Sequence, residues 1–336
     1  MKRQLRKALV AAAVAGVLAA GVSGTASAYV YGLSHLNVQN LLFTGTAPSA
    51  APTYTFTLTN TATLNGVPAI GTATCNNIAG PACGAPPVTL DAPQAAVPAN
   101  ARGSENNFGF LGPGTGNYGS SDSIIRTAQL VSSIPSSSEQ IAEANLDNNG
   151  TASGNAELQS TTNLQFTVTV TGGNFTMTFD ADPDLRAAIL DLPGSYSAQA
   201  NLNSTFTFQS TSLVTPGPAI FIRWSPQGTP GDNDCIAIGA TCTEVADSQA
   251  LNVNLATGTN PSDQRYSFDA ANLFTPFGIT VTGLPSGTYS LALNSVTSVN
   301  VVRNVSQKVP EPASLALVGL GLLGAAFGIR RRFGKS

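Results

Sequence analysis

Alternation of apolar and polar residues is the most regular pattern in this chain. Tyr54, Phe56 and Leu58 alternate with threonines, and the same period of two recurs in residues 164–170 and 175–180. Successive side chains of a strand point to opposite faces, so this period predicts strands with one buried side. About ten such short segments, separated by turn residues, predict an all-β fold: an antiparallel β-sandwich of jelly-roll or Ig-like type with long loops.

Two β-hairpins are expected from the turn residues that join alternating segments. Gly172-Gly173 separates the segments 164–171 and 175–180, which predicts a two-residue hairpin turn. A second glycine-containing turn at residues 283–287 comes directly before the last strand pattern. It predicts a terminal hairpin.

Helix signals are few and short. Ser136–Leu146 starts with serines and has Glu139 in place to close a capping box, so a helix is expected there. Asp182 and Pro183 precede Leu185–Leu190, and they suit the N-cap and first position of a helix of one or two turns.

Proline and glycine are concentrated in residues 71–98 and 100–121, where we expect loops. The second segment has few large apolar side chains to hold it against the protein: Phe108, Phe110, Leu111 and Tyr118. It is therefore either a long packed loop or a disordered one.

The first 28 residues have the layout of a secretory signal peptide. Basic residues precede the apolar run Ala8–Val22, and Ala26-Ser27-Ala28 follows it. An A-x-A sequence in this position predicts export through the Sec translocon and cleavage by signal peptidase. The mature chain would begin at Tyr29.

The last 28 residues, Val309–Ser336, predict a membrane stop. Seventeen uncharged residues, 313–329, lie between Pro310-Glu311-Pro312 and a basic cluster that contains Arg330, Arg331 and Arg332. A helix of that length rises roughly 25 Å, the lower limit for crossing the hydrocarbon layer. The basic cluster would stay cytoplasmic.

This order of Pro-Glu-Pro, short apolar helix and terminal arginines resembles the PEP-CTERM sorting signal of exosortase-processed bacterial surface proteins. The resemblance implies that exosortase cuts near Pro310–Pro312 and releases or transfers the body, residues 29–308. The precursor would lie in the inner membrane and the product at the cell surface or in the extracellular matrix. A simple C-terminal membrane anchor is the alternative.

The body also resembles a family of exosortase-dependent surface proteins. The blocks that carry this resemblance include Phe175–Arg186, with its Phe-Asp-Ala-Asp-Pro core, and Trp224-Ser225-Pro226. That family is defined by export and sorting. It implies no catalytic residues.

Charge excludes some partners for the exported body. Between Tyr29 and Val309 there are seven basic and seventeen acidic residues, a net charge of −10. Nucleic acid and anionic lipid need a positive face to meet their phosphates, so neither is expected to bind. Divalent cations are the favoured counter-ions.

The four cysteines form two close pairs, Cys75 with Cys83 and Cys235 with Cys242. Export places them in an oxidising compartment, which predicts two local disulfides that pin loops. A zinc site is the alternative, but the spacing is not that of zinc ligands and the single histidine, His35, is remote.

Calcium is the one cofactor that the sequence suggests. Asp180, Asp182 and Asp184 place three carboxylates within five residues, and calcium prefers such oxygen clusters. The alternative is that Asp182 caps a helix and Asp184 favours its first turn. Asp232 and Asp234 beside Cys235 are likewise either a surface metal site or a turn.

Enzymatic motifs are lacking. His35 would have to serve as the base of any Ser-His-Asp arrangement, and no G-x-S-x-G elbow occurs. We therefore expect a non-catalytic protein of the cell surface or biofilm matrix. The rival hypothesis is a protein that binds or cleaves exopolysaccharide, with Trp224 or Tyr118 lining an aromatic groove and two carboxylates nearby.

Overall fold

The computed structural model describes residues 28–47, 53–76, 88–127, 135–166, 172–190, 194–229, 231–232, 234–268 and 273–305. The predicted sorting segment and all but the end of the predicted signal peptide lie outside these ranges. Within them the chain is all-β, and no helix is long and apolar enough to cross a membrane.

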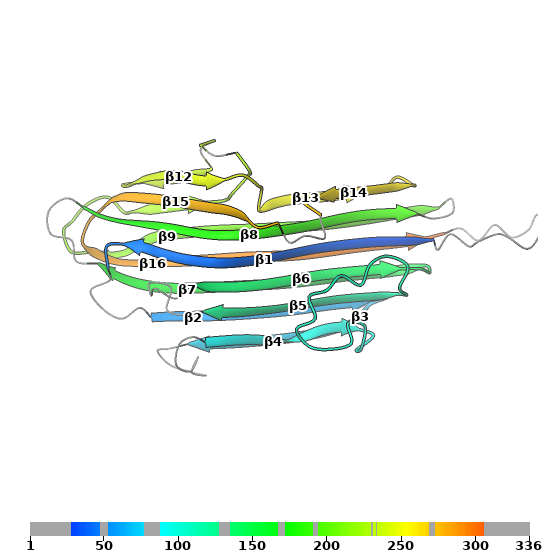
Figure 1. Cartoon of the computed structure of the whole chain (residues 1–336). Coiled ribbons are helices and arrows are strands. Elements are labelled where there is room, and N and C mark those ends of the chain that lie inside the picture. The colour runs from blue at the N-terminus through cyan, green and yellow to red at the C-terminus, as the bar shows by residue number, and fades with distance from the viewer. Residues whose placement is uncertain are drawn as a thin grey trace, which may run out of the picture. The chain divides into compact units, whose positions relative to one another are not determined.

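The described strands form two antiparallel eight-stranded sheets (Figure 1). Sheet A contains, in spatial order, β12 (Thr241–Asp247), β15 (Thr275–Leu284), β8 (Gly173–Leu190), β1 (Tyr29–Gly45), β6 (Ser136–Leu146), β5 (Tyr118–Thr127) and β4 (Val88–Val97), with β14 (Ser262–Tyr266) also paired to β8. Sheet B contains β11 (Cys235–Ile238), β10 (Phe221–Trp224), β9 (Ser195–Leu213), β16 (Gly287–Asn304), β7 (Gly150–Phe166), β2 (Thr53–Leu64) and β3 (Val67–Asn76), with β13 (Asn252–Thr257) also paired to β9.

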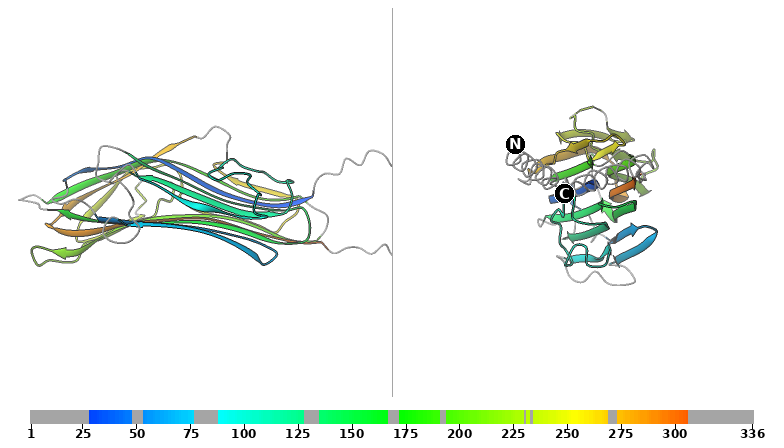
Figure 2. Two further views of the ribbon diagram at one scale, coloured as in Figure 1. Left: turned by 90° about the horizontal axis from the view of Figure 1, so that it is seen from below. Right: turned by 90° about the vertical axis from the view of Figure 1, so that its right-hand side faces the viewer.

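The two sheets lie face to face as two layers (Figure 2), so the predicted antiparallel sandwich is confirmed. Its sixteen described strands exceed the roughly eight of a jelly roll and the seven to nine of an Ig-like domain. Neither named topology describes it.

Aromatic side chains fill the core between β8 and β15 on one side and β9 and β10 on the other. Phe179 stacks on Phe277 with ring centroids 5.0 Å apart, and Phe206 packs against Trp224 at 5.3 Å. At the other edge Tyr54, Phe56 and Leu58 of β2 are buried together with residues of β4, β5 and β7. The alternation of aromatic and threonine residues in β2 was therefore interpreted correctly.

The sheets approach closely where β5 passes over β7. A Cβ on Gly154 would lie 2.1 Å from the carbonyl oxygen of Ser120, and one on Gly119 would lie 2.4 Å from those of Ser153 and Thr63. Only glycine tolerates backbone at that distance. These two positions set the spacing of the layers under the candidate site.

Both predicted helices were wrong. Ser136–Leu146 is β6, hydrogen-bonded between β1 and β5, and Leu185–Leu190 is the end of β8. In β6 the even-numbered residues such as Gln140 face sheet B, where its amide donates to the carbonyl oxygen of Ala156. Strand pairing on both sides outweighs the capping signals, which are local and weak.

Both predicted hairpins were wrong as well. β7 belongs to sheet B and β8 to sheet A, and β15 and β16 are divided in the same way. Gly172 and Gly283 both have φ near +80°, and a Cβ on Gly172 would lie 3.1 Å from the Cα of Gly283. The glycines therefore serve neighbouring connections that cross between the layers.

The segment predicted as loop over 71–98 contains β3 and β4. Residues 98–117, by contrast, are an irregular connection between the neighbouring strands β4 and β5, and we call them the strap. Figure 1 shows the strap lying over β5 and β6. It is a packed loop.

The Cys235–Cys242 disulfide is confirmed, but it does more than pin a loop. It joins β11 at the edge of sheet B to β12 at the edge of sheet A. Cys75, in β3 at the opposite edge of sheet B, is also disulfide-bonded. Its predicted partner Cys83 lies outside the described residues.

Candidate functional site

The outer face of sheet A, which points away from sheet B, buries ionisable side chains. His35 of β1, Glu143 of β6 and Asp184 of β8 are each at most 3% exposed. They share this face with a small apolar cluster that includes Tyr31 and Leu33. An outer sheet face usually meets water, so this one needs a cover, and the strap provides part of it.

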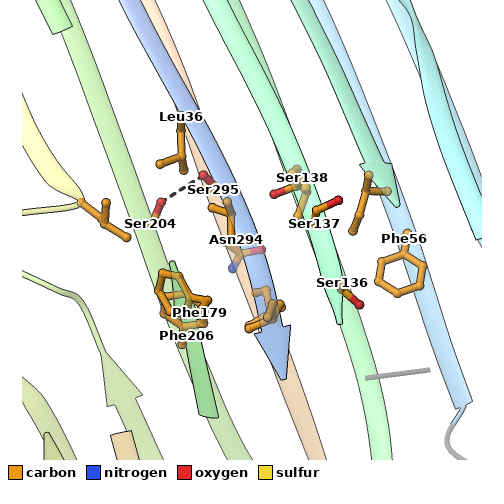
Figure 3. A pocket seen from close by; sticks show the side chains of 16 residues that line it. Leu36, Phe56, Ser136, Ser137, Ser138, Phe179, Ser204, Phe206, Asn294 and Ser295 are labelled. Atoms are coloured by element: carbon orange, nitrogen blue, oxygen red, sulfur yellow. Dashed lines mark hydrogen bonds between the residues drawn. The ribbon is translucent and has the colours of Figure 1, made fainter. Parts of the chain in front are cut away.

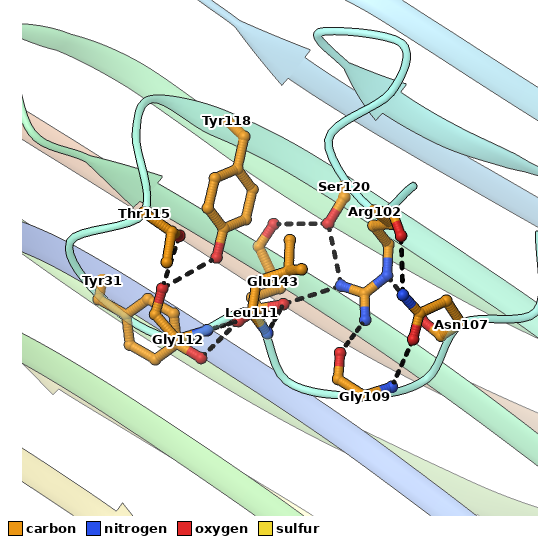
Figure 4. Close-up of polar contacts among 10 residues, drawn as sticks. All are labelled: Tyr31, Arg102, Asn107, Gly109, Leu111, Gly112, Thr115, Tyr118, Ser120 and Glu143. Atoms are coloured by element: carbon orange, nitrogen blue, oxygen red, sulfur yellow. Dashed lines mark hydrogen bonds and ion pairs between the residues drawn. The ribbon is translucent and has the colours of Figure 1, made fainter. Parts of the chain in front are cut away.

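An ion pair between Arg102 of the strap and Glu143 of β6 fixes this cover (Figure 4). Arg102 Nη1 lies 2.8 Å from Glu143 Oε2, and both side chains are fully buried. The guanidinium also donates to the carbonyl oxygens of Asn107 and Gly109, at 2.9 and 2.6 Å. The strap backbone therefore curves around the Arg102 side chain, which it contacts at Asn107 and Gly109.

Glu143 holds the strap through further donors. Its carboxylate accepts hydrogen bonds from the backbone N–H groups of Leu111 and Gly112, at 3.2 and 2.9 Å, and from the Tyr31 hydroxyl at 2.6 Å. A buried carboxylate with this many donors is well satisfied. Burial, followed by the Glu143 charge, raises the pKa of Tyr31 well above its usual value. Tyr31 therefore stays a neutral donor.

Side-chain amides and carboxylates fix the end of the strap to β6. The backbone N–H of Gly116 donates to Asp147 at 2.8 Å, and Asn145 donates to the carbonyl oxygen of Gly116 at 2.6 Å. Asn117 in turn accepts from the N–H of Asp147 at 2.7 Å. The strap is therefore attached along its length.

His35 lies between two carboxylates on the same face. Its Nδ1 is 3.2 Å from Asp184 and its Nε2 is 3.2 Å from Glu139, while Phe110 of the strap meets its ring edge at 5.3 Å. Burial alone would lower the pKa of His35, but the hydrogen bonds to Asp184 and Glu139 outweigh it and raise the pKa. An imidazolium donates from both nitrogens. The two carboxylates therefore favour the protonated form of His35.

A polar groove of about 290 Å³ lies beside His35 on the outer face. Amides, hydroxyls and one ion of each sign line it: Asn37, Gln39, Asn40, Arg126, Pro135, Ser136, Ser137, Ser138 and Glu139. No aromatic residue is among them. Hydrogen-bonding groups of this kind suit a hydroxyl-rich ligand.

The interior of the sandwich contains a cavity of about 50 Å³ (Figure 3). Leu36, Phe56 and Phe179 line it together with serines, of which Ser204 and Ser295 are joined at 3.0 Å. Ligand sites in proteins are usually about 300–1,000 Å³. This cavity has room for a few waters at most.

Two acidic clusters occur among the described residues, each with three carboxylates whose oxygens lie within 4.8 Å of one another. The first joins Asp91 of β4, Glu105 of the strap and Asp122 of β5. Burial, followed by the charge of Glu105, raises the pKa of Asp122 to about 7.

The second cluster lies at the edge where β11 meets β12, beside the disulfide. It contains Asp232, Asp234 and Glu244. Glu244 accepts from the indole N–H of Trp224 at 2.8 Å and from the backbone N–H of Gly231 at 2.7 Å. Burial, followed by the interaction with the Glu244 carboxylate, raises the pKa of Asp234 to about 8.

The calcium site predicted at Asp180, Asp182 and Asp184 is not among these clusters. The three residues follow one another on the outer face of β8, and no helix begins at Asp182. Asp180 accepts from Asn40 at 2.8 Å, and Asp184 contacts His35. The structure does not bring their oxygens as close together as in the other two clusters, and calcium binding there stays a prediction.

The aromatic residues proposed for a sugar-binding groove are both buried. Trp224 is 0% exposed and Tyr118 is 3% exposed. Trp224 packs in the core, and the Tyr118 hydroxyl donates to the carbonyl oxygen of Gly112 in the strap. Neither presents a ring to solvent.

The sequence analysis missed Arg102 and Glu143, the pair that organises this face. They lie 41 residues apart, and the false helix prediction for β6 concealed that Glu143 shares a face with His35. One feature of the sequence could have drawn attention to Arg102. Arg102 is the first lysine or arginine after the predicted signal peptide, and it stands alone in a glycine- and asparagine-rich segment.

Arg102→Met is expected to destabilise the protein by about 3–5 kcal/mol, because it leaves the Glu143 charge buried without its ion-pair partner. Urea unfolding measures this loss. Arg126→Met removes an exposed arginine from the neighbouring strand and should change stability by no more than about 0.5 kcal/mol. The double variant R102M/E143L should recover part of the loss. Equal stability of the Arg102 and Arg126 variants would contradict a stabilising role of the Arg102–Glu143 ion pair.

His35→Gln is expected to cost most stability at acidic pH. The pKa of His35 is raised in the folded protein, so its contribution is complete below about pH 6.5 and is lost as pH rises through the folded pKa. The difference in Tm between wild type and variant should therefore shrink from about pH 6 to pH 9. The carboxylates of Glu139 and Asp184, which face His35, are present in both proteins. A difference that grows with pH would refute the assignment.

Comparison with known proteins gives one match. Residues 308–332 match the family model of the PEP-CTERM protein-sorting motif, which includes the predicted Pro310-Glu311-Pro312 and Arg330–Arg332. No curated protein and no solved structure matches the chain. This protein thus carries a C-terminal PEP-CTERM sorting motif, as exosortase-dependent sorting-domain proteins do.

Proposed function

We propose that the protein is a non-catalytic component of the bacterial surface or of the exopolysaccharide matrix of a biofilm. The sorting motif at residues 308–332 carries the proposal, since it marks an exported protein whose membrane-anchored precursor is processed by exosortase. In the proposed route, the Sec translocon exports the chain and signal peptidase cuts after Ala28. Exosortase then cuts at Pro310-Glu311-Pro312.

The position of β1 supports cleavage after Ala28. β1 starts at Tyr29, which pairs with Leu190 of β8. The first residue of the proposed mature chain is therefore already part of sheet A. Removal of residues 1–28 leaves every described strand intact.

The outer face of sheet B supports a matrix role. Outward-facing residues of three of its strands are uncharged, and most are hydroxyls or amides: threonines at alternate positions 53–63 in β2, then Ser197, Gln199, Asn201, Asn203, Thr205 and Thr207 in β9, then Ser290, Asn294, Ser298 and Asn300 in β16. Some bond across strands, as Asn201 does to Ser298 at 3.3 Å. Such a face can exchange hydrogen bonds with polysaccharide hydroxyls.

Burial of the candidate catalytic and aromatic groups supports the non-catalytic part of the proposal. His35 is 3% exposed and is engaged by two carboxylates. Trp224 is in the core. A general base must reach its substrate directly or through one water, and His35 lies beneath Phe110.

Replacing Pro310, Glu311 and Pro312 together with alanine is expected to block processing. The full-length precursor should then accumulate in the membrane fraction, whereas the wild-type body should appear at the cell surface or in the medium. Fractionation of the native host followed by immunoblotting measures the two forms.

The control for this experiment is Glu157→Ala, which removes a partly exposed carboxylate of the body and should leave sorting unchanged. Wild-type-like release of the triple-alanine variant would contradict processing at this motif. Deletion of the host's exosortase should reproduce the accumulation.

The polar groove favours a second candidate, a protein that binds exopolysaccharide through a defined site. If this candidate holds, Asn37→Ala and Arg126→Ala should each weaken binding of the host's purified exopolysaccharide by about tenfold, the effect of losing roughly 1.4 kcal/mol. Thr57→Ala, on the outer face of sheet B, is the matched control. Isothermal titration measures the affinity. Binding that none of the three changes would favour diffuse contact over a groove site.

A further inference from the structure

We propose that Asp232, Asp234 and Glu244 bind a calcium ion that joins the edges of the two sheets. The site is independent of the proposed matrix function. It differs from the calcium site that the sequence suggested at Asp180, Asp182 and Asp184.

The geometry fits one small cation. Oxygens of the three carboxylates lie within 4.8 Å of one another. Two ligands on opposite sides of a calcium ion are about 4.6–5.2 Å apart, since each Ca–O distance is about 2.3–2.6 Å. One ion can therefore reach all three carboxylates, and Asp232 is exposed at the surface, which leaves room for water ligands.

One buried carboxylate oxygen of Asp234 has no hydrogen-bond donor among the described residues, which points to a cation at this site. Asp234 is 8% exposed, and its Oδ2 accepts from the backbone N–H of Gln227 at 2.8 Å. Its Oδ1 is buried and receives no hydrogen bond from any described donor. Buried oxygens without a partner are rare and costly. A cation held with Asp232 and Glu244 would satisfy this one.

The surroundings hold the ligands in place. Glu244 is positioned by Trp224 and by Gly231, and the backbone N–H of Asp234 donates to Asp232 at 3.1 Å. Asp247, which is fully buried nearby, has its own donors in Gln227 and Gly228. It lies behind the site without needing to be a ligand.

The donor set selects the metal. It consists of carboxylate oxygens, which suit calcium, and the nearby Cys235 and Cys242 are joined to each other and therefore cannot ligate zinc. Magnesium demands a stricter octahedron and gives up its waters reluctantly. Calcium is therefore the expected ion.

The consequence is structural. Trp224 lies in β10 of sheet B and Glu244 in β12 of sheet A, and Asp232 and Asp234 precede β11 of sheet B. Calcium would bind the two layers together beside the disulfide. It would also balance the negative charge of the carboxylates at that point.

Terbium, which replaces calcium at oxygen sites, gives a site-specific test. Trp224 is the only tryptophan of the chain, and its indole N–H contacts the proposed ligand Glu244. In full-length protein purified in mild detergent, selective excitation of tryptophan should therefore produce terbium emission. Calcium should abolish the emission at lower concentration than magnesium does. Calcium should also raise the Tm.

Two variants and one control locate the site. Asp234→Asn and Asp232→Asn, each nearly isosteric, should lose most of the emission and the calcium-induced Tm rise. Asp180→Asn, a carboxylate of the same type on β8, should retain both. The proposal is overturned if wild type gives no sensitised emission, or if Asp234→Asn retains it. Absence of emission together with undiminished stability of Asp234→Asn would show that a shared proton, not a cation, joins Asp234 and Glu244.

Discussion

The constraint on which this structure depends is the burial of charge on the outer face of sheet A. Glu143 and His35 point away from the core, where strand alternation places them, yet neither is exposed. Burying such groups away from water without a partner would cost several kcal/mol each. Arg102 and the backbone N–H groups of Leu111 and Gly112 satisfy Glu143, and that requirement fixes the path of the strap. The strap in turn covers His35.

Polar chemistry is distributed differently over the two sheets. Hydroxyls and amides predominate on the outer face of sheet B, whereas sheet A has buried charges under the strap and a polar groove beside it. Three carboxylates gather near each edge of the sandwich, and those near β11 and β12 lie beside the Cys235–Cys242 disulfide. Edge strands are the weak points of open sheets. The Cys235–Cys242 disulfide joins one edge of sheet B to one edge of sheet A.

The sequence predicted those features that depend on neighbouring residues. The alternation at Tyr54, Phe56 and Leu58 placed β2 correctly, and the spacing of Cys235 and Cys242 indicated their disulfide. Features that depend on distant partners were missed or wrong. Serines and Glu139 imitate a helix cap in what is a central strand, and Gly172 permits a crossing between sheets as readily as a hairpin. Arg102 and Glu143 meet only because β4, β5 and β6 are adjacent, which no local pattern reveals.

Hydrogen exchange at the backbone N–H groups of Leu111 and Gly112 tests this account most directly. Both lie in an irregular loop, where exchange is normally fast, yet both donate to the buried carboxylate of Glu143. The account predicts strong protection of both amides in the wild-type protein and its loss in Glu143→Ala, while amides of the sheet interior such as that of Ala142 remain protected. Rapid exchange of Leu111 and Gly112 in the wild-type protein would contradict it.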